Sequence, residues 1–210
     1  GAVMAMPIGG GAPTTLVANV PTPFGISIDS DDVYFTSGGS VAKVAKTGGP
    51  VVTLATGSEP YQVVVDAGKV FWTDVGTWDV TSIAAAGGQA TVLVNALGAM
   101  HLTVDGSHVY VAEYAGNGSI VEVPRSGGVP AEIVKLENTP SVVTLDATHL
   151  YWATEHELHR AALDGSKVET IAVNDSLTRG LVLDDQFIYW ATDALAIDQQ
   201  PGIAKLAKSP

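Results

Sequence analysis

The sequence predicts an all-β protein built from one repeated, four-stranded antiparallel sheet. Three observations point to this fold: a recurring aspartate–aromatic pattern, apolar stretches of strand length, and pairs of glycines between them. The 210 residues include 23 Gly and 11 Pro, a composition that favours strands joined by many turns. No segment combines a sustained 3.6-residue apolar period with helix caps, so we expect almost no helix.

The repeat is marked by an aspartate at the end of an apolar stretch, and successive copies are 37, 39, 41 and 38 residues apart. These aspartates are Asp29, Asp66, Asp105, Asp146 and Asp184. Five positions after each one stands an aromatic residue: Tyr34, Phe71, Tyr110, Tyr151 and Tyr189. The next position is also aromatic in four copies: Phe35, Trp72, Trp152 and Trp190. Recurrence in every copy favours a structural role, with the aspartate accepting backbone N–H groups in a turn and the aromatics filling space between sheets.

Each copy is therefore predicted to form four strands. An apolar strand precedes the aspartate, an aromatic strand follows it, and a third strand leads to a glycine pair before the fourth. The pairs Gly48-Gly49, Gly87-Gly88 and Gly127-Gly128 would supply the positive φ of two-residue hairpin turns. A four-stranded sheet repeated at this interval is typical of a β-propeller blade, which buries its faces against neighbouring blades.

We treat residues 1–210 as a single propeller domain, with complete repeat units at about 21–58, 59–97, 98–137 and 138–175 and partial units at 1–20 and 176–210. Residues 1–20 would supply two strands around the turn at Gly9-Gly10-Gly11, and the stretch from Ile203 to Ala207 a third strand. One blade is therefore expected to be shared by the two ends or incomplete there. Of the two possible closures we favour six blades, with five as the alternative.

The run Phe71-Trp72-Thr73-Asp74 resembles the four-residue signature of the YWTD propellers in low-density lipoprotein receptor ectodomains. Together with the aspartates and glycine pairs, the pattern is also similar to YWTD-like repeat proteins of secreted bacterial origin. The fourth signature residue is acidic in only two copies, Asp74 and Glu113, and the growth-factor-like modules of the receptors are absent. The resemblance implies a rigid exported platform that binds a protein or ligand on one face and performs no chemistry.

Charge and composition exclude several classes of function. The formal net charge is −12, so no basic stripe is available for nucleic acid or for an anionic membrane surface. No apolar run reaches 18 residues, and no signal peptide is visible. Cysteine is absent, which excludes disulfides and thiol catalysis and fits an intracellular chain or a bacterial exported one. Because of the resemblance to exported propellers, we expect a secreted, periplasmic or cell-surface protein, either by itself or as part of a larger chain or assembly.

The candidate binding residues lie where each innermost strand begins, at the mouth of the expected central channel. The side chains at this position vary between copies, and loops at the end of a propeller channel commonly carry binding. The candidates are Phe24, Tyr61, Gln62, Met100, His101, Ser141 and Arg179. They would suit a protein, a peptide or a carbohydrate; the alternative is that they only plug the channel.

We expect no metal, cofactor or catalytic residue. Two histidines three positions apart in a strand would point to opposite faces, and this spacing occurs in the run Glu155-His156-Glu157-Leu158-His159. We interpret this run as a solvated blade edge. The stretch from Asp29 to Asp32 is rich in carboxylates like a calcium loop but lacks the glycine and distal glutamate of the helix-loop-helix pattern, so calcium there is kept only as the weaker alternative. Two other hypotheses stay open: a structural repeat segment of a surface protein, and a propeller hydrolase or lyase with an axial metal.

Overall fold

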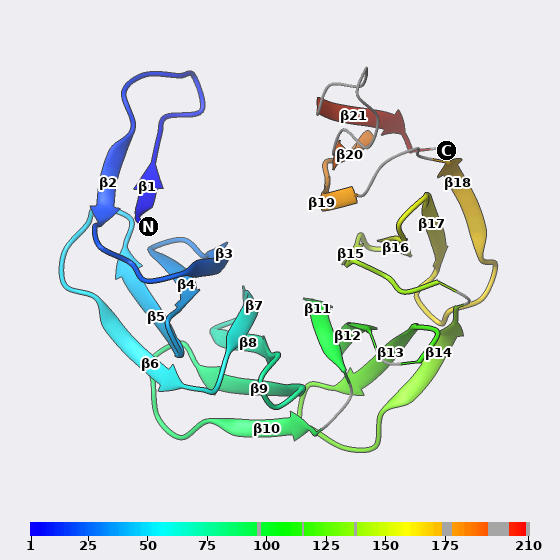
Figure 1. The fold of residues 1–210 in the computed structure, drawn as a ribbon, viewed down its shortest axis with the longest axis horizontal. Helices are drawn as coiled ribbons and strands as arrows, with labels where there is room; N and C mark the ends of the chain where they lie inside the picture. Colours follow the sequence, from blue (N-terminus) through cyan, green and yellow to red (C-terminus); the bar gives the residue numbers. More distant parts are fainter. Residues whose placement is uncertain (96–97, 115, 137, 174–177, 193–201, 209–210) are drawn as a thin grey trace. The chain divides into compact units, whose positions relative to one another are not determined.

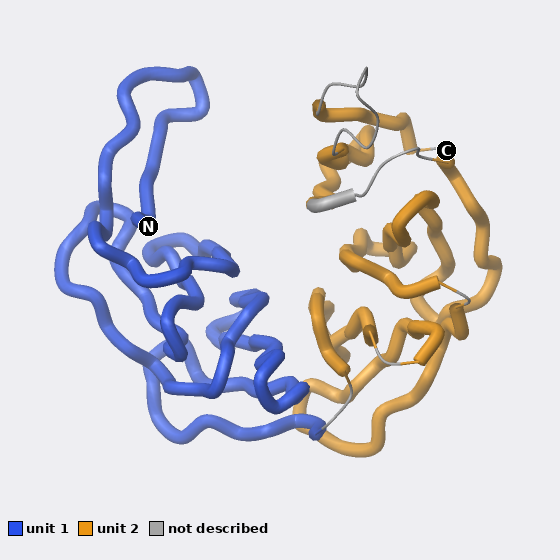
Figure 2. The backbone as a smooth tube through the Cα atoms, in the orientation of Figure 1, with its two compact units in different colours: residues 1–96 blue, residues 97–210 orange. Residues whose placement is uncertain are grey.

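The computed structural model describes residues 1–95, 98–114, 116–136, 138–173, 178–192 and 202–208, except for the side chains of Thr178 and Arg179. The chain divides into two compact units, residues 1–96 and residues 97–210 (Figure 2). In these described ranges every regular element is a β-strand (Figure 1), so the predicted all-β class is confirmed. The same ranges contain no helix long and apolar enough to cross a membrane.

The first unit contains one two-stranded sheet and two four-stranded antiparallel sheets. The two-stranded sheet pairs β1 (Val3–Ala5) with β2 (Thr14–Val17). The next sheet consists of β3 (Pro23–Ile28), β4 (Asp32–Ser37), β5 (Ser40–Ala45) and β6 (Val52–Thr56). The last consists of β7 (Pro60–Asp66), β8 (Lys69–Asp74), β9 (Asp79–Ala84) and β10 (Thr91–Val94).

The second unit repeats this meander three times. Its first sheet contains β11 (Ala99–Val104), β12 (His108–Glu113), β13 (Ser119–Pro124) and β14 (Ala131–Lys135). Its second contains β15 (Val142–Leu145), β16 (His149–Ala153), β17 (Glu157–Ala162) and β18 (Glu169–Val173). The third contains β19 (Thr178–Leu183), β20 (Phe187–Thr192) and β21 (Gly202–Ala207).

Five sheets of three or four strands are therefore present in the described part of the chain. This number matches the five-bladed alternative and not the six blades that we favoured from the sequence. The two strands predicted within residues 1–20 form a sheet of their own, β1–β2, which packs on the β3–β6 sheet through Val3, Val33 and Phe35. The third strand predicted in the last repeat is present as β21.

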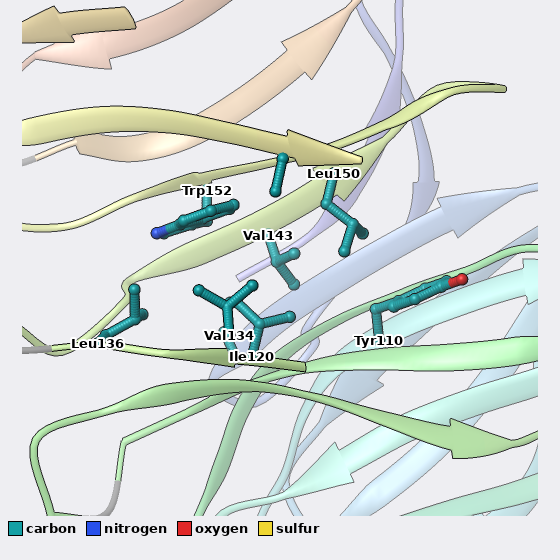
Figure 3. Close-up of a cluster of buried hydrophobic side chains, with 9 residues drawn as sticks. Tyr110, Ile120, Val134, Leu136, Val143, Leu150 and Trp152 are labelled. Atoms are coloured by element: carbon teal, nitrogen blue, oxygen red, sulfur yellow. The ribbon is translucent and has the colours of Figure 1, made fainter. Parts of the chain in front are cut away.

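The second strand of each sheet carries most of the core because it is covered on both faces. In β8, for example, the five residues from Val70 to Asp74 are all buried. Alternation along the strand places the two aromatics of each repeat on opposite faces. Tyr34 therefore packs with Trp72 of the following sheet, and Tyr110 with Trp152. Figure 3 shows the second of these clusters, where Trp152 lies over Val134 and Leu136.

The glycine pairs do have positive φ, but the expected two-residue hairpin turns are wrong. Gly48 and Gly49 have φ of 80° and 130°, and they lie in a connection that runs from residue 46 to residue 51. The Gly48 amide donates to the Ala45 carbonyl, which closes a tight turn at the start of that connection. The connection is longer than a two-residue turn because the pairing of β5 with β6 ends at Lys43 and Val52, two residues before the end of β5.

Candidate functional site

The repeated aspartates form a fixed turn at one end of the sheets. Oδ1 of Asp29 accepts the amides of Asp31 and Asp32 at 2.9 and 2.8 Å, and Oδ2 accepts the Tyr34 hydroxyl at 2.7 Å. The same arrangement recurs with tyrosine–aspartate distances of 2.9, 3.0 and 2.8 Å in three pairs: Tyr110–Asp105, Tyr151–Asp146 and Tyr189–Asp184. Each of these carboxylates is hydrogen-bonded to its own turn and to the tyrosine that follows it, and Asp146 pairs in addition with Lys208, so the geometry supports a structural role.

These bonds stabilise the ionised carboxylate. The amide of Asp32, followed by the Tyr34 hydroxyl, lowers the pKa of Asp29. Burial, reinforced by the adjacent Asp29 carboxylate, raises the pKa of Tyr34 well above its usual range. Tyr34 therefore stays protonated and keeps donating, and the pair is unsuited to proton transfer near neutral pH.

The opposite end of the inner strands carries the binding residues proposed from the sequence. In the first unit the structure brings two of them together: the rings of Phe24 and Tyr61 have centroids 5.0 Å apart and planes tilted by 41°. Phe24 is 52% exposed, and Tyr61 and Gln62 on the neighbouring strand β7 are half-buried. An exposed aromatic pair on adjacent inner strands is a surface on which a ligand could stack.

The backbone beneath this pair is tightly held by Thr36. Its Oγ1 accepts the Gly25 amide at 2.8 Å and donates to the Tyr61 carbonyl at 2.6 Å, which links the two inner strands. The strands approach so closely that a Cβ on Gly25 would lie 2.5 Å from the Tyr61 carbonyl oxygen. Thr73 accepts the Gln62 amide at 3.1 Å in the corresponding position of the next repeat. The two inner strands that carry Phe24 and Tyr61 are therefore held closely against each other.

Asp74, the last residue of the YWTD-like run, fixes the loop that leads into β7. Its two carboxylate oxygens accept four amides at 2.8 to 3.2 Å: those of Ser58, Glu59, Gly76 and Thr77. The side chain is buried. Asp74 thus ties the loop before Tyr61 to the turn between β8 and β9. This role was not predicted from the sequence, in which Asp74 is evident only as part of the four-residue signature.

The other proposed binding residues belong to the second unit. Met100 and His101 lie on β11 and are half-buried, and Ser141, exposed just before β15, donates its hydroxyl to the Ala153 carbonyl at 3.2 Å. The side chain of Arg179 lies outside the described residues. His101 does not face the solvent as a free base, because its Nδ1 accepts the Val143 amide of the neighbouring strand at 3.4 Å.

We predict that His101 makes the stability of the protein depend on pH. Burial in the apolar surroundings of the inner strands lowers the pKa of His101 from 6.5 to about 4. The unfolded chain then binds more protons between pH 6.5 and pH 4, so stability should fall by up to about 3 kcal/mol as the pH is lowered through this window. Thermal unfolding at a series of pH values measures the slope.

The matched controls for this prediction are two histidine substitutions. His101→Asn keeps an acceptor near the Val143 amide but cannot be protonated, so the slope between pH 6.5 and 4 should flatten. His156→Gln, at an exposed imidazole, should leave the slope unchanged. An equally steep slope in the His101 variant would assign the acid sensitivity to other groups.

The histidine-containing run is only partly the solvated edge that the sequence predicted. His156 is exposed, but His159 is buried on β17 and stacks on Trp152, with centroids 5.3 Å apart and planes 15° apart. The expectation fails for His159 because its strand face is turned toward the aromatic core. Among the described residues, no group of three His, Cys, Asp or Glu side chains is placed to hold a metal ion.

Two cavities of the second unit lie beside charged side chains that are not among the binding residues predicted from the sequence. Cavities of about 270 and 370 Å³ share Arg160 and Lys208 in their linings. Lys208 pairs with Asp146 at 2.9 Å, and Arg160 pairs with Glu169 at 2.9 Å. Both cations are neutralised by protein carboxylates, so these cavities provide little electrostatic attraction for an anion. Lys208 could have been noticed in the sequence because Lys46 and Arg125 also directly follow a third strand.

Comparison with known proteins identifies the fold. A nidogen structure from a nidogen–laminin complex matches with a TM-score of 0.74 at 16% identity, covering 86% of this chain and 76% of that one. A gluconolactonase from Xanthomonas campestris matches with a TM-score of 0.70 at 12% identity, covering 85% and 71%. The chain has the β-propeller fold. No protein-family model and no curated protein sequence matches it.

A third similar structure is an extracellular domain. The extracellular domain of a putative hybrid two-component system from B. thetaiotaomicron matches with a TM-score of 0.66 at 13% identity. The alignment covers 87% of this chain but only 27% of that one. At these identities the similarities establish the fold alone, since one propeller fold serves binding proteins and enzymes alike.

Proposed function

We propose that this propeller is a non-catalytic binding module of an exported protein, and that it binds a protein, peptide or carbohydrate at the Phe24–Tyr61 pair. The observation that carries the proposal is the aromatic pair on two adjacent inner strands, in which Phe24 is exposed and Tyr61 half-buried. A preorganised aromatic surface loses little conformational entropy on binding, and aromatic residues dominate binding energies at interfaces. Gln62 beside the pair supplies an amide for hydrogen bonding.

The comparisons support a binding role and an extracellular or periplasmic location only by analogy of fold. One neighbour was crystallised in a protein complex with laminin, and another is an extracellular domain. Both are consistent with a propeller that presents a face to a partner outside the cell. The alternative of a structural repeat segment would leave the aromatic pair without a ligand.

The propeller enzyme remains the second candidate because of the gluconolactonase neighbour. An axial metal would need oxygen or nitrogen ligands from several inner strands. Of the two side chains that the sequence offered there, Gln62 and His101, the second already uses its Nδ1 to accept the Val143 amide. Calorimetric titration of calcium and zinc into chelator-treated protein separates the two functions. A stoichiometric site tighter than about 10 μM would favour the enzyme.

The binding proposal predicts a specific loss of affinity. Glycan and peptide arrays would identify a ligand, and Phe24→Ala or Tyr61→Ala should then weaken its binding at least about tenfold. The thermal midpoint should change little, because Phe24 is exposed and Tyr61 only half-buried.

Tyr114→Ala is the matched control, since this tyrosine is 56% exposed but lies beyond β12 in another repeat. It should retain full affinity. If all three variants bind equally well, the ligand site is elsewhere. If Tyr61→Ala unfolds the protein, the pair is a packing element and the proposed role is wrong.

A further inference from the structure

The turn between β8 and β9 carries an exposed tryptophan in a backbone conformation that favours glycine. Trp78, the last residue of this turn, has a φ of 62° and is 39% exposed. The residue directly before the third strand is Gly39 in the β3–β6 sheet, with a φ of 81°, and Gly118 in the β11–β14 sheet, with a φ of 83°. A bulky side chain is disfavoured at such φ values, so the backbone gives no reason for a tryptophan at this position.

Trp78 lies at the same end of its sheet as Tyr61. Across the three strands, Asp74 on β8 pairs with Pro60 on β7 and with Asp79 on β9. Tyr61 directly follows Pro60, and Trp78 directly precedes Asp79. Neighbouring strands are about 4.8 Å apart, so the outer members of this row are separated by about 10 Å. The Asp74 carboxylate also accepts amides from both the turn of Trp78 and the loop before Tyr61, which holds the two segments in place.

The charged side chains of the first unit are segregated between its two ends. Its sequence has no arginine or histidine, and its lysines are Lys43, Lys46 and Lys69. All three lie toward the end where the repeated aspartates form their turns. The end that carries Trp78 has instead the carboxylates of Glu59 and Asp79. An aromatic face attracts a cation, and nearby carboxylates strengthen that attraction, so this end is complementary to a positively charged group.

We propose that this end of the first unit binds a basic segment of a partner protein, with an arginine or lysine side chain on the indole of Trp78. The inference rests on the proposed function and names the chemistry of its ligand: an apolar residue packs on the Phe24–Tyr61 pair, and the cation meets Trp78 and the nearby carboxylates. In an extended peptide, residues two apart point to the same side and are separated by about 7 Å, and a long basic side chain spans the remaining distance. The disfavoured backbone of Trp78 is retained because the indole is needed for binding and not for folding.

Tryptophan fluorescence reports directly on the proposed contact. Trp78 is exposed, whereas the other three tryptophans of the chain are buried: Trp72, Trp152 and Trp190. Acrylamide therefore quenches mainly Trp78. The probes are twelve-residue peptides from an array, each made with its arginines and lysines and again with glutamine in their place. We expect a basic peptide to protect Trp78 from acrylamide, and its glutamine version to bind at least about tenfold more weakly.

Trp78→Gly tests the role of the indole, because two other sheets carry glycine at this position. By calorimetry it should bind the basic peptide about tenfold more weakly, while its thermal midpoint stays within about 3 °C of the original. Trp78→Phe keeps an aromatic face and should retain most of the affinity. Glu59→Gln should weaken binding about threefold, whereas the matched variant Asp31→Asn, at an exposed carboxylate of the opposite end, should not weaken it.

Three results would overturn the inference. The first is preferential binding of glycans or of peptides without basic residues, and the second is unchanged affinity in Trp78→Gly. The third is a fall of more than about 3 °C in the midpoint of Trp78→Gly, which would make the indole a packing element of the turn. The proposed binding function would remain supported in each case if Phe24→Ala weakened binding of the ligand that was found. A protein that binds nothing on either the glycan or the peptide array would overturn both.

Discussion

Replacement of Asp74 by alanine is expected to lower the free energy of unfolding by about 3 kcal/mol. The buried carboxylate accepts four backbone amides from two loops, and removing it leaves those donors without an acceptor. The amides belong to exposed residues, so water can reach them and limit the cost. Urea unfolding monitored by tryptophan fluorescence measures the change.

Asp74→Asn separates hydrogen bonding from packing in this loop. The amide side chain keeps one oxygen acceptor but turns an NH₂ group toward backbone donors, so we expect it to be nearly as destabilising as alanine. Asp31→Ala, at an exposed carboxylate on the other end of its sheet, should cost less than about 0.5 kcal/mol. A stable Asp74→Ala variant would mean that the loop before β7 is held by other contacts. In that case Asp74 would not be needed to hold the strand that carries Tyr61.

The repeat made most of the fold predictable from the sequence. A side-chain pattern that returns at the same offset places each strand, and the Asp29 and Tyr34 positions define a turn whose hydrogen bonds are local. The connections after the third strands were predicted wrongly because the repeated pattern encodes only such local contacts. Their length depends on how far the fourth strand is displaced along the sheet, which the glycine pairs do not encode.

The candidate site was predictable in position but not in geometry. Phe24 and Tyr61 occupy the same place in successive repeats, which the sequence shows. Their contact depends on register shifts between Pro23 and Ile26 and between Pro60 and Val63, which turn the first residues of both strands. Such irregularities arise from the packing of neighbouring strands and leave no separate trace in the sequence.

Burial of individual residues was the least predictable feature, because it depends on which sheet lies opposite. His159 follows an acidic, polar run and yet stacks on Trp152. Ile26 is an apolar residue in a buried repeat position and yet is exposed. In both cases the local sequence is misleading, since the neighbouring sheet decides whether the side chain meets solvent.

Trp152→Ala is expected to have the largest effect of any single substitution, lowering the free energy of unfolding by about 4 kcal/mol. The indole is fully buried between two sheets of the second unit, where it contacts a cluster that includes Val134, Leu136 and Val143 (Figure 3). The loss includes the stack on His159 and a cavity that fixed strands cannot close. Differential scanning calorimetry should show a midpoint lower by about 10 °C.

Trp152→Phe distinguishes packing from hydrogen bonding in the same cluster. Within the described structure the Trp152 Nε1 is buried without a hydrogen-bond partner, so phenylalanine removes an unsatisfied donor while keeping a ring against His159. We expect a cost of about 2 kcal/mol, half that of alanine, because the smaller ring leaves a smaller cavity. Trp78→Ala, at a 39% exposed tryptophan, is the control and should change stability by less than about 1 kcal/mol. Equal losses for Trp152→Phe and Trp152→Ala would show that the indole nitrogen has a partner, such as a bound water, and that the cluster is held by more than apolar packing.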